Sequence, residues 1–152
     1  MFLNKKWLNK RHINYKKVCF KDEREIQTIR GVLNRIEQNT CLRFQRHHSD
    51  SPMLDFIAFE RSKAGDVQGC YTLVGKCISP IGNLCVRERK GGYKSVIVMD
   101  PGCSDEAMTF HLLLHKLGLW HEHSRFDRNK YIKILTENIK EGKFCGNNCL
   151  RD

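Results

Sequence analysis

Apolar residues recur at helical spacing in two parts of the chain. Between residues 22 and 38 they form one stripe, preceded by acidic residues that suit the positive end of a helix dipole. The stripe consists of Ile26, Ile29, Val32, Leu33 and Ile36. Between residues 104 and 117 the chain is apolar nearly all round, with Ser104 as the expected N-cap and Gly118 in the C-cap position. We therefore expect an amphipathic first helix and a buried second helix.

Short runs of β-branched and aromatic residues predict strands around these helices. The clearest run is Ser95-Val96-Ile97-Val98-Met99, which ends at Asp100-Pro101-Gly102. Shorter strands are expected over residues 41–44, 54–59 and 70–74. Residues 1–20 are basic and without a regular pattern, and residues 76–90 contain Pro80 and Gly82. We expect both of these segments to be irregular.

The charge of the chain is concentrated near its start. The formal net charge is +10, and no acidic residue precedes Asp22. A basic arm of this kind could attract nucleic acid or an anionic surface. No nucleic-acid-binding motif accompanies it, so a solvated basic arm is the favoured interpretation. The length of 152 residues suits one domain.

Eight cysteines in a chain of this length indicate an oxidising compartment. Zinc-finger ligation is the alternative, but the chain contains no pair of C-x2-C knuckles. The first residues lack the apolar run of a secretion signal, and no segment is long and apolar enough to span a membrane. A cysteine-rich chain without a signal is expected to be a fragment of a longer precursor.

The candidate chemistry lies on the second helix. His111 and His115 are four residues apart, so both imidazoles fall on one face, one turn apart. Gly118 can adopt a left-handed conformation and turn the chain so that His121 returns to the same point. The pattern H-x-x-x-H-x-x-G-x-x-H predicts a zinc site with three histidine ligands. The alternative of two satisfied core histidines and an unrelated third is disfavoured by the offsets of the glycine and of His121.

The residue after the first histidine departs from the pattern of a zinc hydrolase. Such enzymes place a glutamate there, which takes a proton from the zinc-bound water and delivers it to the leaving amine. Leu112 occupies this position and can do neither. The proton-transfer contribution that would be lost is typically about 10²–10⁴-fold. Glu122 is the nearest other carboxylate, and nothing in the sequence places it over the water.

The run HLLLHKLGLWHEHSRFDRNKYIKILTENIKEG, from His111 to Gly142, resembles the zinc-binding region of the astacin family of metalloendopeptidases. The similarity extends upstream through residues 101–103, 69–71 and 40–44 to Tyr15 and Trp7. It implies an α+β, metzincin-like fold: a mixed twisted sheet with two long helices, mainly the N-terminal half that carries the zinc-binding helix. Residues 1–142 would form this incomplete domain, and residues 143–152 a tail.

The resemblance also implies roles for individual residues. Zn²⁺ would bind to His111, His115 and His121, and Cys70 would pair with Cys103. The strand that contains Ser95, Val96, Ile97, Val98 and Met99 is similar to an edge strand that receives a peptide substrate as an added strand. Gly118 and Glu122 would be structural, the latter as a partner of the mature N-terminus. Family members are secreted and cleave internal peptide bonds.

Four departures from the family pattern have consequences. Leu112 replaces the glutamate. The chain stops soon after Gly142, so the C-terminal half of the family domain is expected to be missing, and with it the Met-turn; no methionine follows Met108. Residues 77–90 are an insertion, and either Cys77 pairs with Cys85 or the segment lies outside the folded domain. The family partner of Cys41 is also missing, so that it either stays free or captures Cys145 or Cys149.

These observations predict a member of the zinc metalloendopeptidase family with peptidase activity absent or severely reduced. A pseudoprotease that holds zinc and binds peptides is the alternative from a different class. A truncated product without function is a third, and a nucleic-acid-binding domain ranks last.

Overall fold

Among the residues that the computed structural model describes, six strands form one mixed sheet, in the order β2-β1-β3-β6-β4 with β5 also beside β6. The strands β1 (His12–Lys17), β2 (Arg43–Arg46), β3 (Phe56–Glu60) and β6 (Tyr93–Met99) run parallel to one another. The strands β4 (Cys70–Thr72) and β5 (Cys85–Arg87) pair antiparallel with β6. The sheet is therefore mixed, as expected.

The structure describes residues 12–17, 20, 22–47, 55–89 and 91–139. The predictions about Trp7, the basic residues before residue 12, Cys145, Cys149 and the tail 143–152 lie outside these residues. The described chain divides into two compact units, the first ending at Leu119 and the second beginning at Trp120. Within the described residues no helix is long and apolar enough to cross a membrane.

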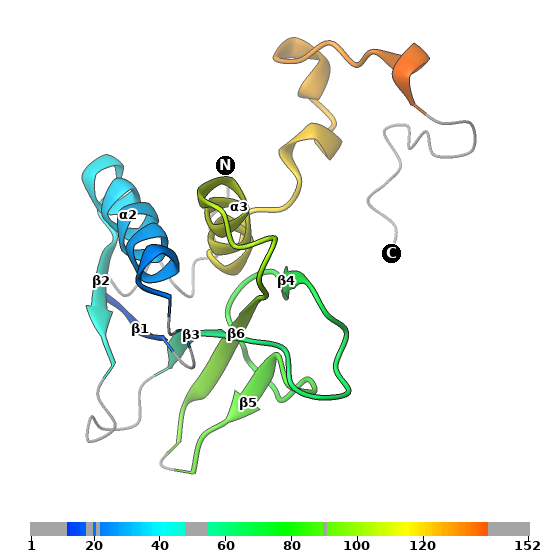
Figure 1. Ribbon diagram of the computed structural model, residues 1–152. Helices are drawn as coiled ribbons and strands as arrows, with labels where there is room; N and C mark the ends of the chain where they lie inside the picture. The colour runs from blue at the N-terminus through cyan, green and yellow to red at the C-terminus, as the bar shows by residue number, and fades with distance from the viewer. Residues whose placement is uncertain (1–11, 18–19, 21, 48–54, 90, 140–152) are drawn as a thin grey trace. The chain divides into compact units, whose positions relative to one another are not determined.

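Two helices cover one face of the sheet in the first unit (Figure 1). Helix α2 (Glu23–Asn39) begins at Asp22, whose carboxylate accepts a hydrogen bond from the backbone N–H of Arg24 over 2.9 Å. Helix α3 (Glu106–Lys116) begins at Asp105, which accepts from the N–H of Met108 over 2.8 Å. The prediction of Ser104 as the cap of this helix is wrong by one residue.

The main core lies between the helices and the sheet. The apolar stripe of α2 supplies four fully or nearly buried side chains, which meet residues of β1, β3, β6 and α3. Members of this cluster are Ile29, Val32, Leu33, Ile36, Leu42, Ile13, Ile57, Phe59, Ile97, Met99, Leu112, Leu113 and Leu117. A smaller cluster on the other face contains Phe56, Ala58, Val96 and Val98. Strands β3 and β6 are thus buried on both faces, which explains their continuous apolar runs.

Strand β1 corrects the expectation that the first twenty residues are irregular. It pairs with β2 and β3, and Ile13 is fully buried. Three of its six residues, His12, Lys16 and Lys17, are basic or imidazole side chains, which obscured the alternation around Ile13 and Tyr15. Because β1, α2 and β2 follow one another and the strands are parallel, they form a β-α-β unit.

The insertion belongs to the folded domain. Its residues Cys85–Arg87 form β5, which pairs with residues 93–95 of β6, so the prediction of an uninterrupted loop over 76–90 is wrong there. Cys77 is bonded to Cys85, which was one of the two alternatives. The predicted disulfide between Cys70 and Cys103 is confirmed, with an S–S distance of 2.00 Å. Cys41 is free and exposed.

The prediction that residues 95–99 form an edge strand is also wrong. Strand β6 pairs with β3 along one side and with β5 and β4 along the other. Even Val96, between the two antiparallel partners, donates to the carbonyl of Leu84 over 2.9 Å and accepts from the hydroxyl of Thr72 over 2.7 Å. Because the ladder positions of β6 are occupied by the chain itself, a peptide cannot add to it as a further strand.

Candidate metal centre

Helix α3 holds two of the three histidines of the motif on one face. The rings of His111 and His115 lie with their centroids 4.3 Å apart and nearly perpendicular to one another. The helix is anchored by three leucines, Leu112, Leu113 and Leu117, which enter the main core. Burial of these leucines fixes the rotation of the helix, and the rotation decides where the two imidazoles point.

The helix ends in a turn that depends on Gly118. Its φ of 103° lies in the left-handed region, which costs a glycine little. The N–H of Gly118 donates to the carbonyl of His115 over 2.9 Å, and the N–H of Leu119 donates to the carbonyl of Leu114 over 3.0 Å. This pair of hydrogen bonds is the Schellman arrangement of a helix C-terminus. The predicted glycine turn is therefore confirmed.

The same turn orients one of the imidazoles. Nδ1 of His115 lies 2.7 Å from the carbonyl oxygen of Leu119. A carbonyl oxygen can only accept, so in the neutral ring the proton is on Nδ1 and the lone pair is on Nε2. A second hydrogen bond of this kind is a common feature of metal-ligating histidines, because it fixes both the tautomer and the orientation of the ring. His115 is only 9% exposed, which restricts the ring further.

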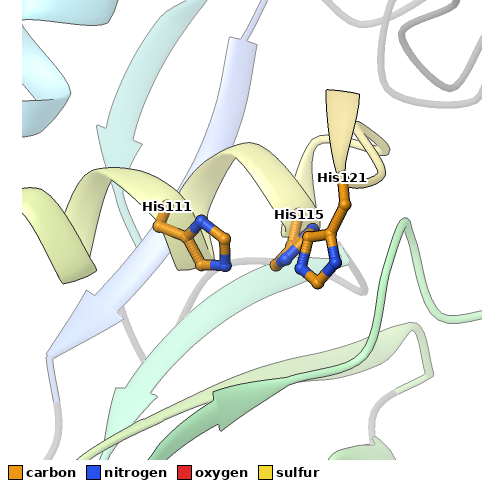
Figure 2. Close-up of side chains that lie close together, drawn as sticks. All are labelled: His111, His115 and His121. Carbon is orange, nitrogen blue, oxygen red and sulfur yellow. The ribbon is translucent and has the colours of Figure 1, made fainter. Parts of the chain in front are cut away.

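The three histidines of the motif gather in one place. One ring nitrogen from each of His111, His115 and His121 lies within 4.8 Å of the others, and Figure 2 shows the rings close together. Two nitrogens bound to one tetrahedral zinc at about 2.0–2.1 Å would be about 3.4 Å apart, a distance that modest rotation of the rings can provide. Three neutral nitrogen donors with a free fourth position are the donor set of catalytic zinc sites, so the residues fit this metal.

The pKa of His111 also favours metal binding. Partial desolvation of its ring and then the neighbouring His115 lower the pKa of His111 below the usual 6.5. The imidazole therefore stays neutral over a wider range of pH than a fully solvated one, and only neutral imidazole binds a metal.

The structure shows the surroundings of the two positions considered for catalysis, Leu112 and Glu122. Leu112 is 4% exposed, and its side chain belongs to the main core. Glu122 accepts a hydrogen bond from Nη1 of Arg125 over 2.9 Å and is otherwise largely exposed. Its predicted role beside the mature N-terminus concerns residues that the structure does not describe, so that role stays a prediction.

Comparison with known proteins identifies the class to which this fold and this cluster belong. The chain matches the Astacin family of peptidases over residues 1–147. It is 31% identical over 118 residues to zinc metalloproteinase nas-6 of Caenorhabditis elegans, covering 78% of this chain and 28% of that protein. It is 34% identical over 115 residues to high choriolytic enzyme 1 of Oryzias latipes, covering 76% of this chain and 35% of that protein.

The solved structures include a similar one. High choriolytic enzyme 1, a hatching enzyme zinc-protease of the medaka fish, aligns with a TM-score of 0.56 and 28% sequence identity. The alignment covers 84% of this chain and 54% of that one. The protein therefore belongs to the astacin family of zinc metalloproteases, whose members bind zinc. It spans between about an eighth and about a third of the length of the curated relatives it matches.

Two contributors to the site had no signal in the sequence. The carbonyl of Leu119 orients His115, and the N–H of Gly75 donates to the carbonyl of His115 over 2.8 Å. Both are main-chain groups, which every residue possesses, so a pattern of side chains cannot single them out. Gly118 was the only sequence feature that pointed towards one of these groups, because it predicted the turn that places the carbonyl of Leu119.

Proposed function

We propose that His111, His115 and His121 bind one Zn²⁺ and that the chain is an astacin-family protein whose peptidase activity is absent or severely reduced. The observation that supports zinc binding is the convergence of three ring nitrogens within 4.8 Å. The hydrogen bond from His115 to Leu119 supports it further, because it fixes the orientation of the ring.

Zinc in such a site would lower the pKa of a bound water and polarise a substrate carbonyl. The residues of this chain would hold the metal, but the leucine beside His111 cannot accept a proton. The side chain of Leu112 is part of the core. Glu122 is engaged by Arg125. Without a base the loss in rate is about 10²–10⁴-fold for the proton transfer alone.

Zinc binding can be tested with a pair of neighbouring histidines. His121 belongs to the cluster, whereas His123 is exposed and is not a member of it. We expect the purified chain to hold about one zinc, His121→Ala to lose it, and His123→Ala to keep it, as measured by elemental analysis after gel filtration. Equal zinc content in the two variants would contradict the assignment of the ligands.

The missing base can be tested at position 112. We expect the natural chain to show no chelator-sensitive cleavage of a quenched fluorescent peptide library. Leu112→Glu should cleave faster than Leu112→Gln, which has the same shape but accepts no proton. Hydrolysis by the natural chain at rates typical of proteases would refute the proposal, as would equal rates for the two variants.

A pseudoprotease would still bind peptides, and we propose β4 as the strand that receives them. Among the described residues β4 pairs only with β6, so its other edge is open for an added strand. Hydrogen exchange tests this directly: a saturating peptide should slow exchange in residues 70–72 and leave β6 unchanged. Protection that appears in β6 alone would contradict the assignment.

We further propose that the protein works in an oxidising, extracellular compartment. Two disulfides, Cys70–Cys103 and Cys77–Cys85, support this setting. Mass spectrometry of the protein isolated from its source without reductant should find both bonds intact, and free thiols at all four positions would contradict it.

A further inference from the structure

A cavity of about 340 Å³ lies within the unit that begins at Trp120. Its walls combine charged and apolar side chains. They include Glu122, Arg125, Asp127, Arg128, Tyr131 and Ile132. The volume lies in the range of small-molecule and peptide side-chain sites, and a few polar groups among apolar walls are typical of them.

One arginine in this cavity has a donor without an acceptor. Arg128 is only 7% exposed, and its Nη1 donates to the carbonyl of His123 over 3.1 Å. Its buried Nε–H finds no acceptor among the residues that the structure describes. Buried donors in native proteins are nearly always hydrogen-bonded. We therefore expect the Nε–H of Arg128 to have an acceptor outside the described residues.

The carboxylates of the cavity are committed to the other arginine. Arg125 donates from Nε and Nη2 to the two oxygens of Asp127, both over 2.9 Å, and from Nη1 to Glu122 over 2.9 Å. These bonds raise the pKa of Arg125 and hold the pKa of Asp127 below its usual range. Arg128 therefore has no carboxylate partner among the described residues that line its cavity.

The charges of the lining residues limit which kinds of acceptor could bind to Arg128. Among the described lining residues two arginines and two carboxylates cancel, so these walls do not favour a dianion such as phosphate. A single carboxylate can accept two parallel hydrogen bonds from the edge of a guanidinium that carries Nε. Tyr131 and Ile132 are 77% and 43% exposed beside it, and they offer an apolar surface to the residue next to that carboxylate.

We propose that this cavity, the Arg128 pocket, is a binding site for a peptide carboxylate that is flanked by an apolar side chain. The carboxylate accepts from Arg128, and the apolar side chain packs against Tyr131. The proposal does not depend on zinc binding at the histidines. The carboxylate belongs either to a chain terminus or to an acidic side chain, and matched peptides distinguish these two sources.

The test uses three short probes and the NMR signal of the Nε–H group of Arg128. The probes are acetyl-Ala-Leu with a free terminus, acetyl-Asp-Leu-amide, and the neutral acetyl-Asn-Leu-amide. We expect at least one of the two carboxylate probes to shift this signal in a saturable manner with a dissociation constant on the order of millimolar. The neutral probe should bind at least about tenfold more weakly, and whichever carboxylate probe binds identifies the source.

Variants separate the pocket from other cationic surfaces. Arg128→Met should weaken binding of the carboxylate probe at least about tenfold, whereas Lys130→Met removes a charge from the same turn without touching the cavity and should change it less than about twofold. Tyr131→Ala removes an exposed wall and should weaken binding several-fold, which provides a test even if Arg128→Met does not fold. Equal binding of the neutral probe, or carboxylate binding that both Arg128→Met and Tyr131→Ala retain, overturns the proposal; the latter result would point to the metal site.

Discussion

The hydroxyl of Ser104 donates to Oε1 of Glu25 over 2.6 Å, and this hydrogen bond joins the start of α3 to the first turns of α2. The second oxygen of Glu25 accepts from Arg61, which also donates to the carbonyl of Met99 at the end of β6. The guanidinium lies 4.5 Å over the ring of Phe20. Arg61 thus joins α2 to the end of β6, and Glu25 extends the connection to the start of α3.

Replacing this arginine should therefore destabilise the fold. We expect Arg61→Lys to lower the free energy of unfolding by about 2–3 kcal/mol, because lysine has a single nitrogen in place of the two coplanar nitrogens with which the guanidinium reaches Glu25 and Met99. Arg30→Lys is the matched control: its contact with Glu23 spans 3.4 Å between largely exposed side chains, and the change should be about 0.5 kcal/mol or less. Denaturation by urea measures both values. Equal effects of the two substitutions would show that the hydrogen bonds of Arg61 do not contribute specially to stability.

The turn after α3 provides a second prediction. Gly118→Ala places a β-carbon on a residue with φ of 103° and should cost about 1–2 kcal/mol. Zinc affinity should fall with it, because the turn carries the carbonyl of Leu119. In contrast, Gly31→Ala lies in the exposed middle of α2, where an added β-carbon meets nothing within 4 Å, and should raise stability by about 0.5–1 kcal/mol. Loss of stability in both variants would contradict this account.

Acid should weaken the loop that leads into β4. The carboxylate of Asp100 accepts from the N–H of Gly69 over 2.8 Å and from the N–H and hydroxyl of Ser62. These bonds, that from Gly69 first, hold the pKa of Asp100 below the usual 3.8. A lowered pKa in the folded state means that the stabilisation is complete above pH 3.8 and is lost as the pH falls through the folded-state value.

Asp100→Asn should consequently cost about 1–3 kcal/mol at pH 7. The difference from the natural chain should shrink below pH 3.8, where the natural carboxylate also becomes protonated. Glu137→Gln, at an exposed position, is the control and should show neither effect. A deficit that stays constant down to about pH 2 would indicate that the charge of Asp100 is not involved.

The two disulfides should differ in how much they contribute to the free energy of unfolding. Cys70 and Cys103 close a loop of 33 residues, and Cys77 and Cys85 close one of 8. Loop-closure entropy predicts losses of about 3.7 and about 2.5 kcal/mol when each pair is replaced by serine. Thermal unfolding of the two double variants compares them directly. A larger loss for the Cys77–Cys85 pair would show that the short loop acts through native packing.

Local patterns in the sequence predicted much of this protein. The stripe of α2, the β-branched run of β6 and the glycine after α3 all have local physical causes, namely side-chain periodicity and backbone freedom. The motif also named the three histidines that the structure brings together. These features could be predicted because each depends on residues within a few turns of one another.

Only the tertiary structure decided which strand is an edge and what the insertion does. Strand pairing joins residues far apart in the chain: β6 meets β3, β4 and β5, and that pairing moved the open edge from residues 95–99 to β4. Strand β1 was hidden for the same reason, because its burial comes from partners on both sides rather than from its own sequence. The sequence by itself determined the helices, the glycine turn and the donor set; long-range pairing, which leaves no local signal, decided the rest.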